Sequence, residues 1–220
     1  MGIIRPTKSA SNDGFVGYKR VSILNITDMS AKYDWADIYL DVELALEGSK
    51  YSNKLQIKGS FEYQGDTIQT NSLVKNIYHF LDAINCNIGI NGDGKWEDQQ
   101  GNPVDDVATF LNQHYASGKT PDAKDHTYNL WVYLYNSKPT KAGKKSYKTV
   151  HNYVQPATAE GKAELQRGIE WRKANGYLNE LTPEEAKVHN ESNGKTATAG
   201  MSNSTASYNF PDDDSDVSNF

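Results

Sequence analysis

Aromatic and lysine side chains gather between residues 131 and 153, a combination suited to binding nucleic acid. In the first part every second residue is a large ring: Trp131, Tyr133 and Tyr135. The last part carries two more rings and a lysine: Tyr147, Lys148 and Tyr153. Four lysines stand between them: Lys138, Lys141, Lys144 and Lys145. Rings stack on bases, at about 1–3 kcal/mol per base, and lysines neutralise phosphates, so the segment predicts a surface for single-stranded nucleic acid.

The rings also have a structural interpretation, which stays open from sequence. Aromatic residues at a period of two are usually core or half-core residues. They can therefore cover a neighbouring helix, such as the one expected over residues 158–174. A second group belongs to the early strands and either lines the same groove or stands on a solvated face: Tyr18, Lys19, Arg20, Lys54 and Lys58.

The chain ends in carboxylates followed by a terminal ring: Asp212, Asp213, Asp214, Asp216 and Phe220. Residues 190–207 are mostly Ser, Asn, Thr, Ala and Gly, which cannot bury enough apolar surface to offset chain ordering. We therefore expect a folded domain over residues 1–188 and a disordered tail over residues 189–220. An acidic cluster with one hydrophobic anchor suits a basic pocket on a partner protein, and a solvated, solubilising tail is the alternative.

The net charge of −5 is distributed unevenly. From residue 189 onward there are five acidic residues and one basic residue, a net of −4, which leaves −1 on residues 1–188. A nearly neutral body can still carry a strongly basic groove, because binding responds to the local field rather than to the total charge.

The sequence contains no enzyme motif of the P-loop, G-x-S-x-G or H-E-x-x-H type, so we expect neither an enzyme nor a cofactor. The segment 91–97 resembles a calcium loop, but Lys95 and Trp96 occupy its fifth and sixth positions, where a ligand and a glycine are needed. We expect a loop or a hairpin turn there and no metal. A nuclease that uses Asp37 and Asp41, which share a strand face, remains a third possibility.

Several bulk properties favour a cytoplasmic protein. No apolar run approaches the roughly 20 residues needed to cross a bilayer, and no signal-peptide pattern follows Met1. Pro6 occupies the position where a myristoylation signal has Ser or Thr. The single cysteine, Cys86, cannot form an internal disulfide and is expected to be a buried structural residue.

Hydrophobic periodicity predicts five strands and four helices. Strands are expected at 15–26, with a bulge where the alternation changes phase, at 36–47, around 55–63, at 128–135 and at 147–154. Helices are expected at 71–83, from Asn102-Pro103 onward, at 158–174 with Gly176 as its stop, and after a capping box at Thr182.

Five strands with helices between the third and fourth is the order of an OB-fold, a small, partly open barrel. The predicted class is therefore mainly β with helices, an OB-fold-like five-stranded barrel with helical insertions. A mixed α+β sandwich is the alternative.

The chain resembles phage-encoded single-stranded DNA-binding proteins of the replication machinery. The resemblance lies in a β-rich body with lysines and aromatics, a Ser/Asn/Gly tether, and the acidic cluster that ends in Phe220. Asn219 stands where the bacterial family has proline, and Val217-Ser218 lengthen the spacer. The resemblance implies coating of single-stranded DNA without sequence preference and recruitment of replication or recombination proteins by the tail. A phage structural or host-takeover adaptor that binds only protein is the competing hypothesis, and a homo-oligomer stays open.

Overall fold

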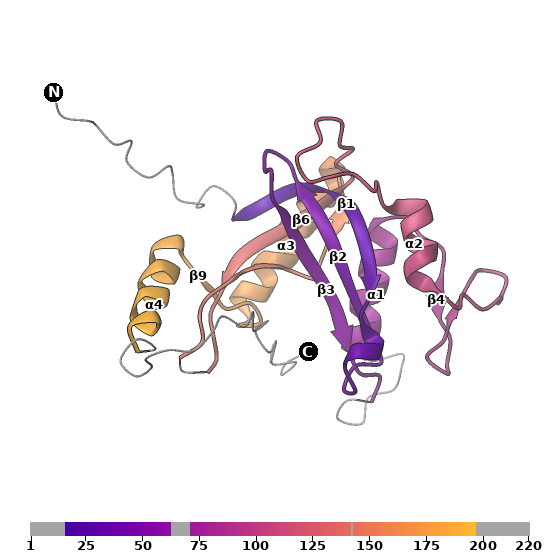
Figure 1. Ribbon diagram of the computed structural model, residues 1–220, viewed down its shortest axis with the longest axis horizontal. Coiled ribbons are helices and arrows are strands. Elements are labelled where there is room, and N and C mark those ends of the chain that lie inside the picture. The colour runs from indigo at the N-terminus through magenta and orange to yellow at the C-terminus, as the bar shows by residue number, and fades with distance from the viewer. Residues whose placement is uncertain (1–15, 63–70, 142, 197–220) are drawn as a thin grey trace, which may run out of the picture.

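The fold is centred on one curved antiparallel sheet, described by a computed structural model that covers residues 16–62, 71–141 and 143–196. Its five longer strands are β1 (Gly17–Asp28), β2 (Ile38–Leu46), β3 (Ser52–Gly59), β6 (Leu130–Ser137) and β7 (Lys148–Val150). They are ordered β3-β2-β1-β6-β7, and Figure 1 shows β3, β2 and β1 side by side. β3 and β7, at the two ends of this order, come close to one another, so the sheet is a nearly closed barrel.

The long strand β1 makes the barrel possible because it serves two neighbours. Its first half, Gly17 to Val21, pairs with β6, and its second half, from Val21 onward, pairs with β2. The pairing with β2 shifts register between Ile23 and Asn25, which confirms the bulge predicted from the change of phase. A bulge bends a strand and increases its twist, as closure of a small barrel requires.

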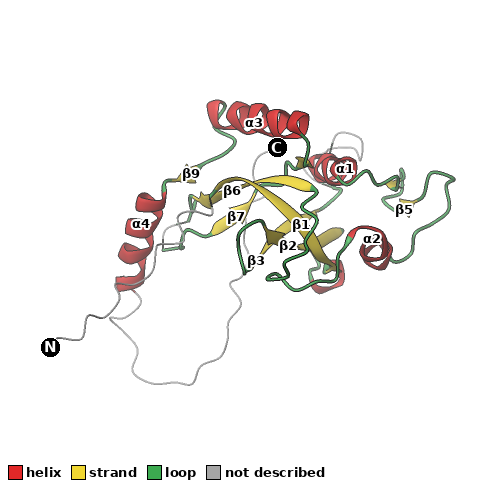
Figure 2. Cartoon of the chain, turned by 90° about the horizontal axis from the view of Figure 1, so that it is seen from above, coloured by secondary structure: helices red, strands yellow, loops and turns green. Residues whose placement is uncertain are grey.

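Four helices surround the sheet: α1 (Ser72–Ala83), α2 (Val107–Tyr115), α3 (Ala159–Ala174) and α4 (Pro183–Thr196). In the view from above, α3 lies along one side of the sheet, and α4 stands beyond β9 at one end (Figure 2). The short strands β8 (Gln155–Pro156) and β9 (Glu180–Leu181) both pair with β6, and β4 (Gly89–Ile90) forms a separate hairpin with β5 (Trp96–Glu97). A 3₁₀ turn, η2 (Ser30–Lys32), follows β1.

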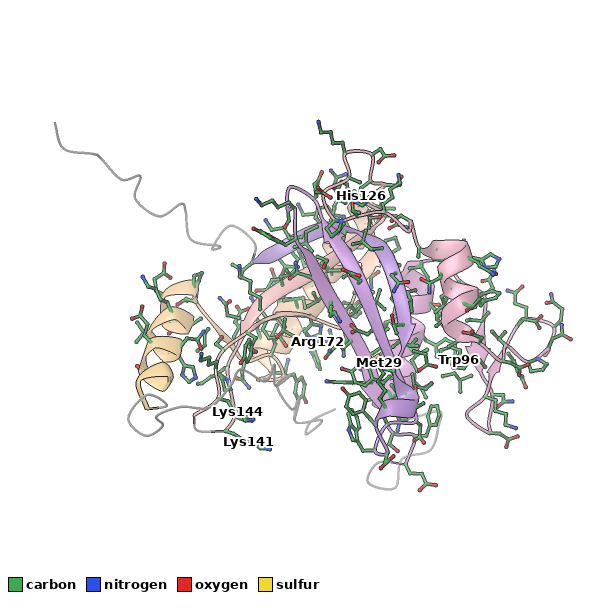
Figure 3. The ribbon with its side chains drawn as sticks, in the orientation of Figure 1. Met29, Trp96, His126, Lys141, Lys144 and Arg172 are labelled. Atoms are coloured by element: carbon green, nitrogen blue, oxygen red, sulfur yellow. The ribbon has the colours of Figure 1, made fainter. Side chains whose placement is uncertain are left out.

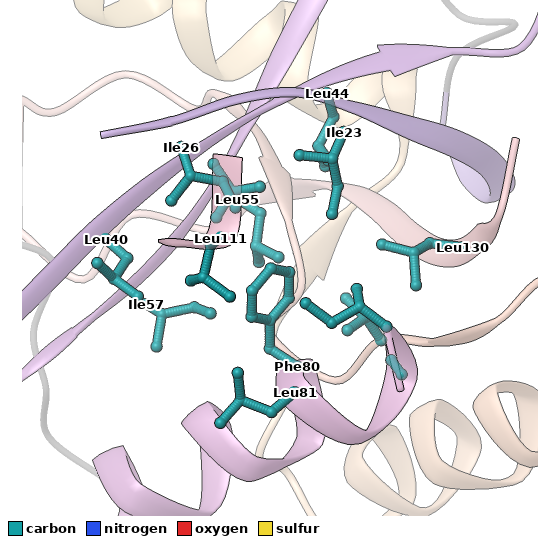
Figure 4. Packing of buried hydrophobic residues seen from close by; sticks show 14 of the residues in the cluster. Ile23, Ile26, Leu40, Leu44, Leu55, Ile57, Phe80, Leu81, Leu111 and Leu130 are labelled. Atoms are coloured by element: carbon teal, nitrogen blue, oxygen red, sulfur yellow. The ribbon is translucent and has the colours of Figure 1, made fainter. Parts of the chain in front are cut away.

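The main core fills the barrel and extends to α1 and α2. Alternate residues of each strand point inward, as the period of two predicts, and α1 contributes Ile77, Phe80 and Leu81. Figure 4 shows Phe80 beside Leu111 of α2 and among side chains from the strands. Phe80 and Leu111 are both fully buried. The fold class, an α+β protein with a five-stranded barrel-like antiparallel sheet, is thus confirmed.

A second, smaller core lies between β6 and α3. It consists of Tyr133, Tyr153, Leu165, Ile169 and Leu178, with Tyr18, Trp131 and Tyr135 packed against it. Strand β6 is therefore buried on both faces, which explains why it is apolar in both phases of its alternation. Cys86 is buried, as expected, and belongs to the main core.

The predicted start of α2 is wrong. The helix begins at Val107, capped by the Asp106 side chain, which accepts a hydrogen bond from the amide of Thr109 at 2.9 Å. Pro103 instead forms a β-bridge with Glu97, and the amide of Val104 donates to the carbonyl of Trp96 at 2.9 Å. These bonds hold residues 103 and 104 in an extended conformation against the β4–β5 hairpin, so these two residues cannot belong to the helix.

Helix α4 begins at the predicted capping box but runs further than expected. The amide of Thr182 donates to Glu185, and the amide of Glu185 donates back to the Thr182 hydroxyl, at 2.8 and 3.2 Å. The helix then continues to Thr196, so the expectation of disorder is wrong for residues 189–196. Among the described residues, no helix is both long and apolar enough to span a bilayer.

Candidate nucleic-acid interface

The alternating rings of β6 lie beneath α3 rather than at the surface. Tyr133 is only 6% exposed, and its hydroxyl donates to Glu180 at 2.6 Å and accepts from Lys173 at 2.7 Å. Burial and the bond to Glu180 raise the pKa of Tyr133 to about 12. The ring of Tyr18 packs on it with centroids 4.9 Å apart. The contacts of the Tyr133 ring and hydroxyl are therefore made by other groups of the protein.

Tyr153, from the segment after β7, is enclosed in the same way. The Arg172 guanidinium lies 4.3 Å from its ring centroid, and the His79 ring meets it edge-on at 5.0 Å. Its hydroxyl donates to Glu164 at 3.2 Å. A base has no access to this ring while α3 stays in place.

The remaining rings of β6 are partly covered. Trp131 donates from Nε1 to the carbonyl of Thr158 at 3.1 Å, and the Lys162 ammonium lies 5.0 Å from its ring centroid. Tyr135 stacks beside Tyr133 with centroids 6.2 Å apart, and burial raises its pKa. In this structure the four rings pack against α3, as the structural interpretation of the sequence expects: Trp131, Tyr133, Tyr135 and Tyr153. Stacking of bases on these rings stays a prediction, and it requires α3 to move.

The lysines between β6 and β7 are at the surface, on a segment that we call the lysine loop (residues 138–147). Its exposed cations are Lys138, Lys141, Lys144 and Lys145, and it also carries Tyr147, which is 55% exposed. Figure 3 shows Lys141 and Lys144 projecting from this loop. Lys148 follows in β7 and is partly buried. The loop therefore presents cations and one ring to solvent.

Helix α4 holds the lysine loop in place. The Asn190 side chain accepts from the amide of Ser146 at 2.7 Å and donates to its carbonyl at 3.0 Å. His189 forms a 2.9 Å hydrogen bond with the carbonyl of Lys144. This contact joins segments 44 residues apart, so no local sequence pattern indicates it.

The cations predicted on the first three strands are engaged with neighbouring groups. Arg20 forms a salt bridge with Glu47, and Lys54 forms one with Asp41 at 2.6 Å. Lys58 donates to Gln56 at 3.1 Å, and its ammonium lies 5.2 Å from the ring centroid of Tyr39. Lys19 is partly buried on β1. Of this group, Lys58 is the one placed beside an aromatic ring cluster.

That cluster, which sequence reasoning missed, is an aromatic platform formed by Tyr33, Trp35 and Tyr39. Tyr33 and Trp35 are 37% and 44% exposed, whereas Tyr39 beneath them is 4% exposed. The ring of Tyr33 stacks on Tyr39 with centroids 5.0 Å apart, and Tyr33 and Trp35 are 5.8 Å apart. The available signal was two rings spaced by two immediately before the predicted strand 36–47.

Local hydrogen bonds fix the loop that carries the platform, residues 29–37. The Asp28 carboxylate accepts from the amide and hydroxyl of Ser30, and the Ser30 hydroxyl oxygen accepts from the amide of Tyr39 at 2.8 Å. The amide of Met29 also donates to the carbonyl of Tyr39 at 2.7 Å. The rings are therefore positioned before any ligand arrives.

The platform and the lysine loop occupy the places that an OB-fold uses to bind oligonucleotides: the face of the second and third strands, the loop between the first two strands, and the loop between the last two. Here β1 and β2 are joined by the platform loop, and β6 and β7 by the lysine loop. The arrangement can stack bases at one loop and neutralise phosphates at the other.

The two carboxylates that suggested a nuclease both bind groups on neighbouring strands or loops. Asp37 accepts from the Ser60 hydroxyl and the amide of Phe61, both at 2.7 Å, and Asp41 pairs with Lys54. Within the described residues, no three His, Cys, Asp or Glu side chains are grouped so that they could hold a metal ion. In the segment 91–97, for which a loop or hairpin turn is predicted, residues 91–95 form the turn of the β4–β5 hairpin and residues 96–97 are β5 itself.

The predicted partner-binding residues of the tail, Asp212, Asp213, Asp214, Asp216 and Phe220, lie outside the described residues. Comparisons with protein-family models, curated proteins and solved structures gave no match for this chain. The barrel and the two loops are therefore the basis on which a function can be assigned.

Proposed function

We propose that the protein binds single-stranded DNA without sequence preference, in the context of phage DNA replication or recombination. The observation that carries the proposal is the exposed aromatic platform at the end of the β2–β3 face, where Tyr33 and Trp35 pack against Tyr39. The Lys58 ammonium lies 5.2 Å from the ring centroid of Tyr39. Large exposed rings are costly to leave in water, so a surface that keeps two of them together favours a ligand with flat faces.

The lysine loop supplies the electrostatic part of the proposed interface. Its four exposed lysines neutralise phosphates at any sequence, because every nucleotide carries the same charge. Bases stack on Tyr33 and Trp35 without base-specific hydrogen bonds, so the strand is bound without sequence preference. The acidic residues of the tail are proposed to recruit replication or recombination proteins, as the resemblance implies.

A gel shift with labelled oligo-dT tests the proposal. We expect the full-length chain to retard the oligonucleotide at low ionic strength and to lose affinity as salt rises, because counterions are released when lysines meet phosphates. A duplex of the same length should bind more weakly, since paired bases do not offer their faces to rings. No retardation of oligo-dT at low salt would overturn the proposal.

One observation favours the competing adaptor function. Trp171 and Tyr177, at the C-terminal end of α3, are 56% and 42% exposed with ring centroids 5.2 Å apart. Exposed Trp and Tyr are enriched at protein interfaces, where they form energetic hot spots. If oligo-dT does not bind, this pair is the first surface to test by Trp171→Ala in a partner-capture experiment.

A further inference from the structure

A cavity of about 550 Å³ lies between α1 and the β4–β5 hairpin, and none of its lining residues belongs to the aromatic platform or the lysine loop. Val74, Tyr78 and Ile90 form its apolar walls. Lys75, His79 and Asp82 bring polar groups to it. A concave apolar site with a few convergent polar groups is the usual form of a small-ligand site.

The Tyr78 wall is fixed by the backbone opposite it. The Tyr78 hydroxyl oxygen accepts a hydrogen bond from the amide of Ile90 at 3.1 Å. A Cβ at Gly89 would stand only 2.7 Å from that hydroxyl, so a glycine is needed for this close approach. The phenol is thereby set as a flat wall.

The two charges are arranged along α1 with a defined spacing. Lys75 and Asp82 are seven residues apart, so they lie on the same helix face and about 10 Å apart along its axis. Neither forms an ion pair with another described residue. His79 lies between them, and burial lowers its pKa, which keeps the imidazole neutral at pH 7. The cavity therefore has a cationic end, a neutral middle and an anionic end.

We propose that this cavity binds a nucleotide, with its base stacked on Tyr78, its phosphate at Lys75 and an exocyclic amine of the base donating to Asp82. A nucleotide combines the three features that the walls require: a flat ring, an anion at one end and hydrogen-bond donors at the other. The proposal stands apart from the proposed function, because these residues do not contribute to the platform or the loop.

An NMR titration of the full-length protein tests the assignment, with the amides of Ile90 and Gly92 as reporters. We expect AMP and CMP to shift both amides, and ribose 5-phosphate, which lacks a base, to bind at least tenfold more weakly. UMP should bind several-fold more weakly than CMP, because it has no exocyclic amine for Asp82. Equal binding of ribose 5-phosphate and AMP, or no shift with either AMP or CMP, would overturn the proposal.

Matched variants separate stacking from structure. Tyr78→Phe keeps the ring and should bind AMP within about threefold of the parent, whereas Tyr78→Ala should lose at least tenfold. Asp82→Asn should reduce the preference for CMP over UMP. Tyr51→Ala removes an exposed tyrosine of the turn between β2 and β3 and should leave AMP binding unchanged. If Tyr78→Phe and Tyr78→Ala, both shown by circular dichroism to be folded, bind AMP equally, stacking on Tyr78 is rejected.

The source of the nucleotide is decided by a parallel titration with oligo-dA. Shifts at Gly92 with both AMP and oligo-dA mean that the cavity accepts either a free nucleotide or one unit of a strand, and shifts with AMP alone restrict it to free nucleotides. Tyr78→Ala should leave oligo-dT retardation unchanged, because Tyr78 belongs neither to the aromatic platform nor to the lysine loop, which form the proposed DNA interface. A failure of the cavity proposal is thus distinguishable from a failure of DNA binding.

Discussion

Gly168 of α3 lies so close to Tyr153 that a Cβ built on it would stand 2.2 Å from the Cε1 atom of the ring. The ring cannot move away easily, because Arg172 and His79 pack against it. A similar approach occurs at Gly161, where a Cβ would meet the carbonyl of Pro156 at 2.1 Å. Two glycines thus allow α3 to lie directly against the segment 153–156 and to cover the rings of β6.

Replacing Gly168 with alanine should therefore destabilise the fold. Alanine stabilises a helix by about 1 kcal/mol relative to glycine. Overpacking typically costs about 1–3 kcal/mol, and a Cβ only 2.2 Å from a ring carbon should cost an amount near the upper end of that range. We expect a net loss of about 1–2 kcal/mol in the free energy of unfolding, measured with urea. Glu170→Ala, at an exposed position of the same helix, is the control and should change stability by less than about 0.5 kcal/mol.

His151 should make stability depend on pH between about 6.5 and 4. Burial, aided by Arg172, lowers the pKa of His151 to about 4, and its Nδ1 accepts a hydrogen bond from the amide of Tyr153 at 2.9 Å. Below pH 6.5 the unfolded chain takes up a proton that the folded chain refuses until about pH 4, so stability falls as pH falls through this window. The loss can reach about 3 kcal/mol.

The variant that checks this effect is His151→Asn, which keeps an acceptor near the amide of Tyr153 but does not titrate. Urea midpoints measured at pH 7.5 and pH 5 should differ less in the variant than in the parent. Identical pH dependence of the two proteins would assign the acid sensitivity to other groups.

Removal of the platform rings should weaken DNA binding without unfolding the protein. Tyr33→Ala and Trp35→Ala should each cost about 1–3 kcal/mol of binding free energy, which is about 5- to 150-fold in affinity for oligo-dT. Tyr51→Ala is the matched control, because Tyr51 is 63% exposed in the turn between β2 and β3, at the opposite end of β2 from the platform loop. An equal effect of all three changes would argue against stacking at the platform.

The salt dependence of DNA binding should show how many lysines of the lysine loop contact phosphates. If its four lysines and Lys148 each meet a phosphate, log affinity falls with log salt with a slope of about −3.5, at roughly −0.7 per contact. Changing the four loop lysines to glutamine should reduce the slope to about −0.7. Lys124→Gln, on an exposed loop elsewhere, should leave it unchanged. A slope that does not respond to the fourfold change would place the phosphates on another surface.

Deleting residues 212–220 tests the predicted tail. If the cluster of carboxylates competes with DNA for the same cations, as we propose, its removal should tighten oligo-dT binding, most clearly at low salt. Capture of replication or recombination proteins should weaken in the same variant. Unchanged behaviour in both assays would reject a role for the tail.

Elements with a local signal could be predicted from the sequence. The strict alternation around Ile38–Leu46 predicts β2, and the capping box at Thr182 predicts the start of α4. Gly176, at a φ of 74°, follows the end of α3, where a stop is predicted. Each of these patterns is complete within a few residues, so no distant contact is needed to interpret it.

Features that depend on long-range packing could not be predicted. From the sequence, the rings of β6 fit a binding face and a second core equally well. Their cover in the structure depends on how closely α3 packs, as at Gly168 and Tyr153, and no local pattern indicates that contact. The start of α2 depends on the bond between Val104 and Trp96. The exposure of Tyr33 and Trp35 depends on how the 29–37 loop folds back over Tyr39, for which two rings in a short loop give only a weak signal.

The hydrogen bonds between Asn190 and Ser146 also determine where the last part of the chain is anchored. They place α4 against the lysine loop, and α4 is the last described element before the acidic residues in the sequence. An acidic sequence linked to such a point would act on the lysine loop at an effective concentration that depends on the length of the linker and not on the concentration of protein in solution. Any competition between the carboxylates and a strand for these lysines is then intramolecular, and dilution of the protein does not weaken it.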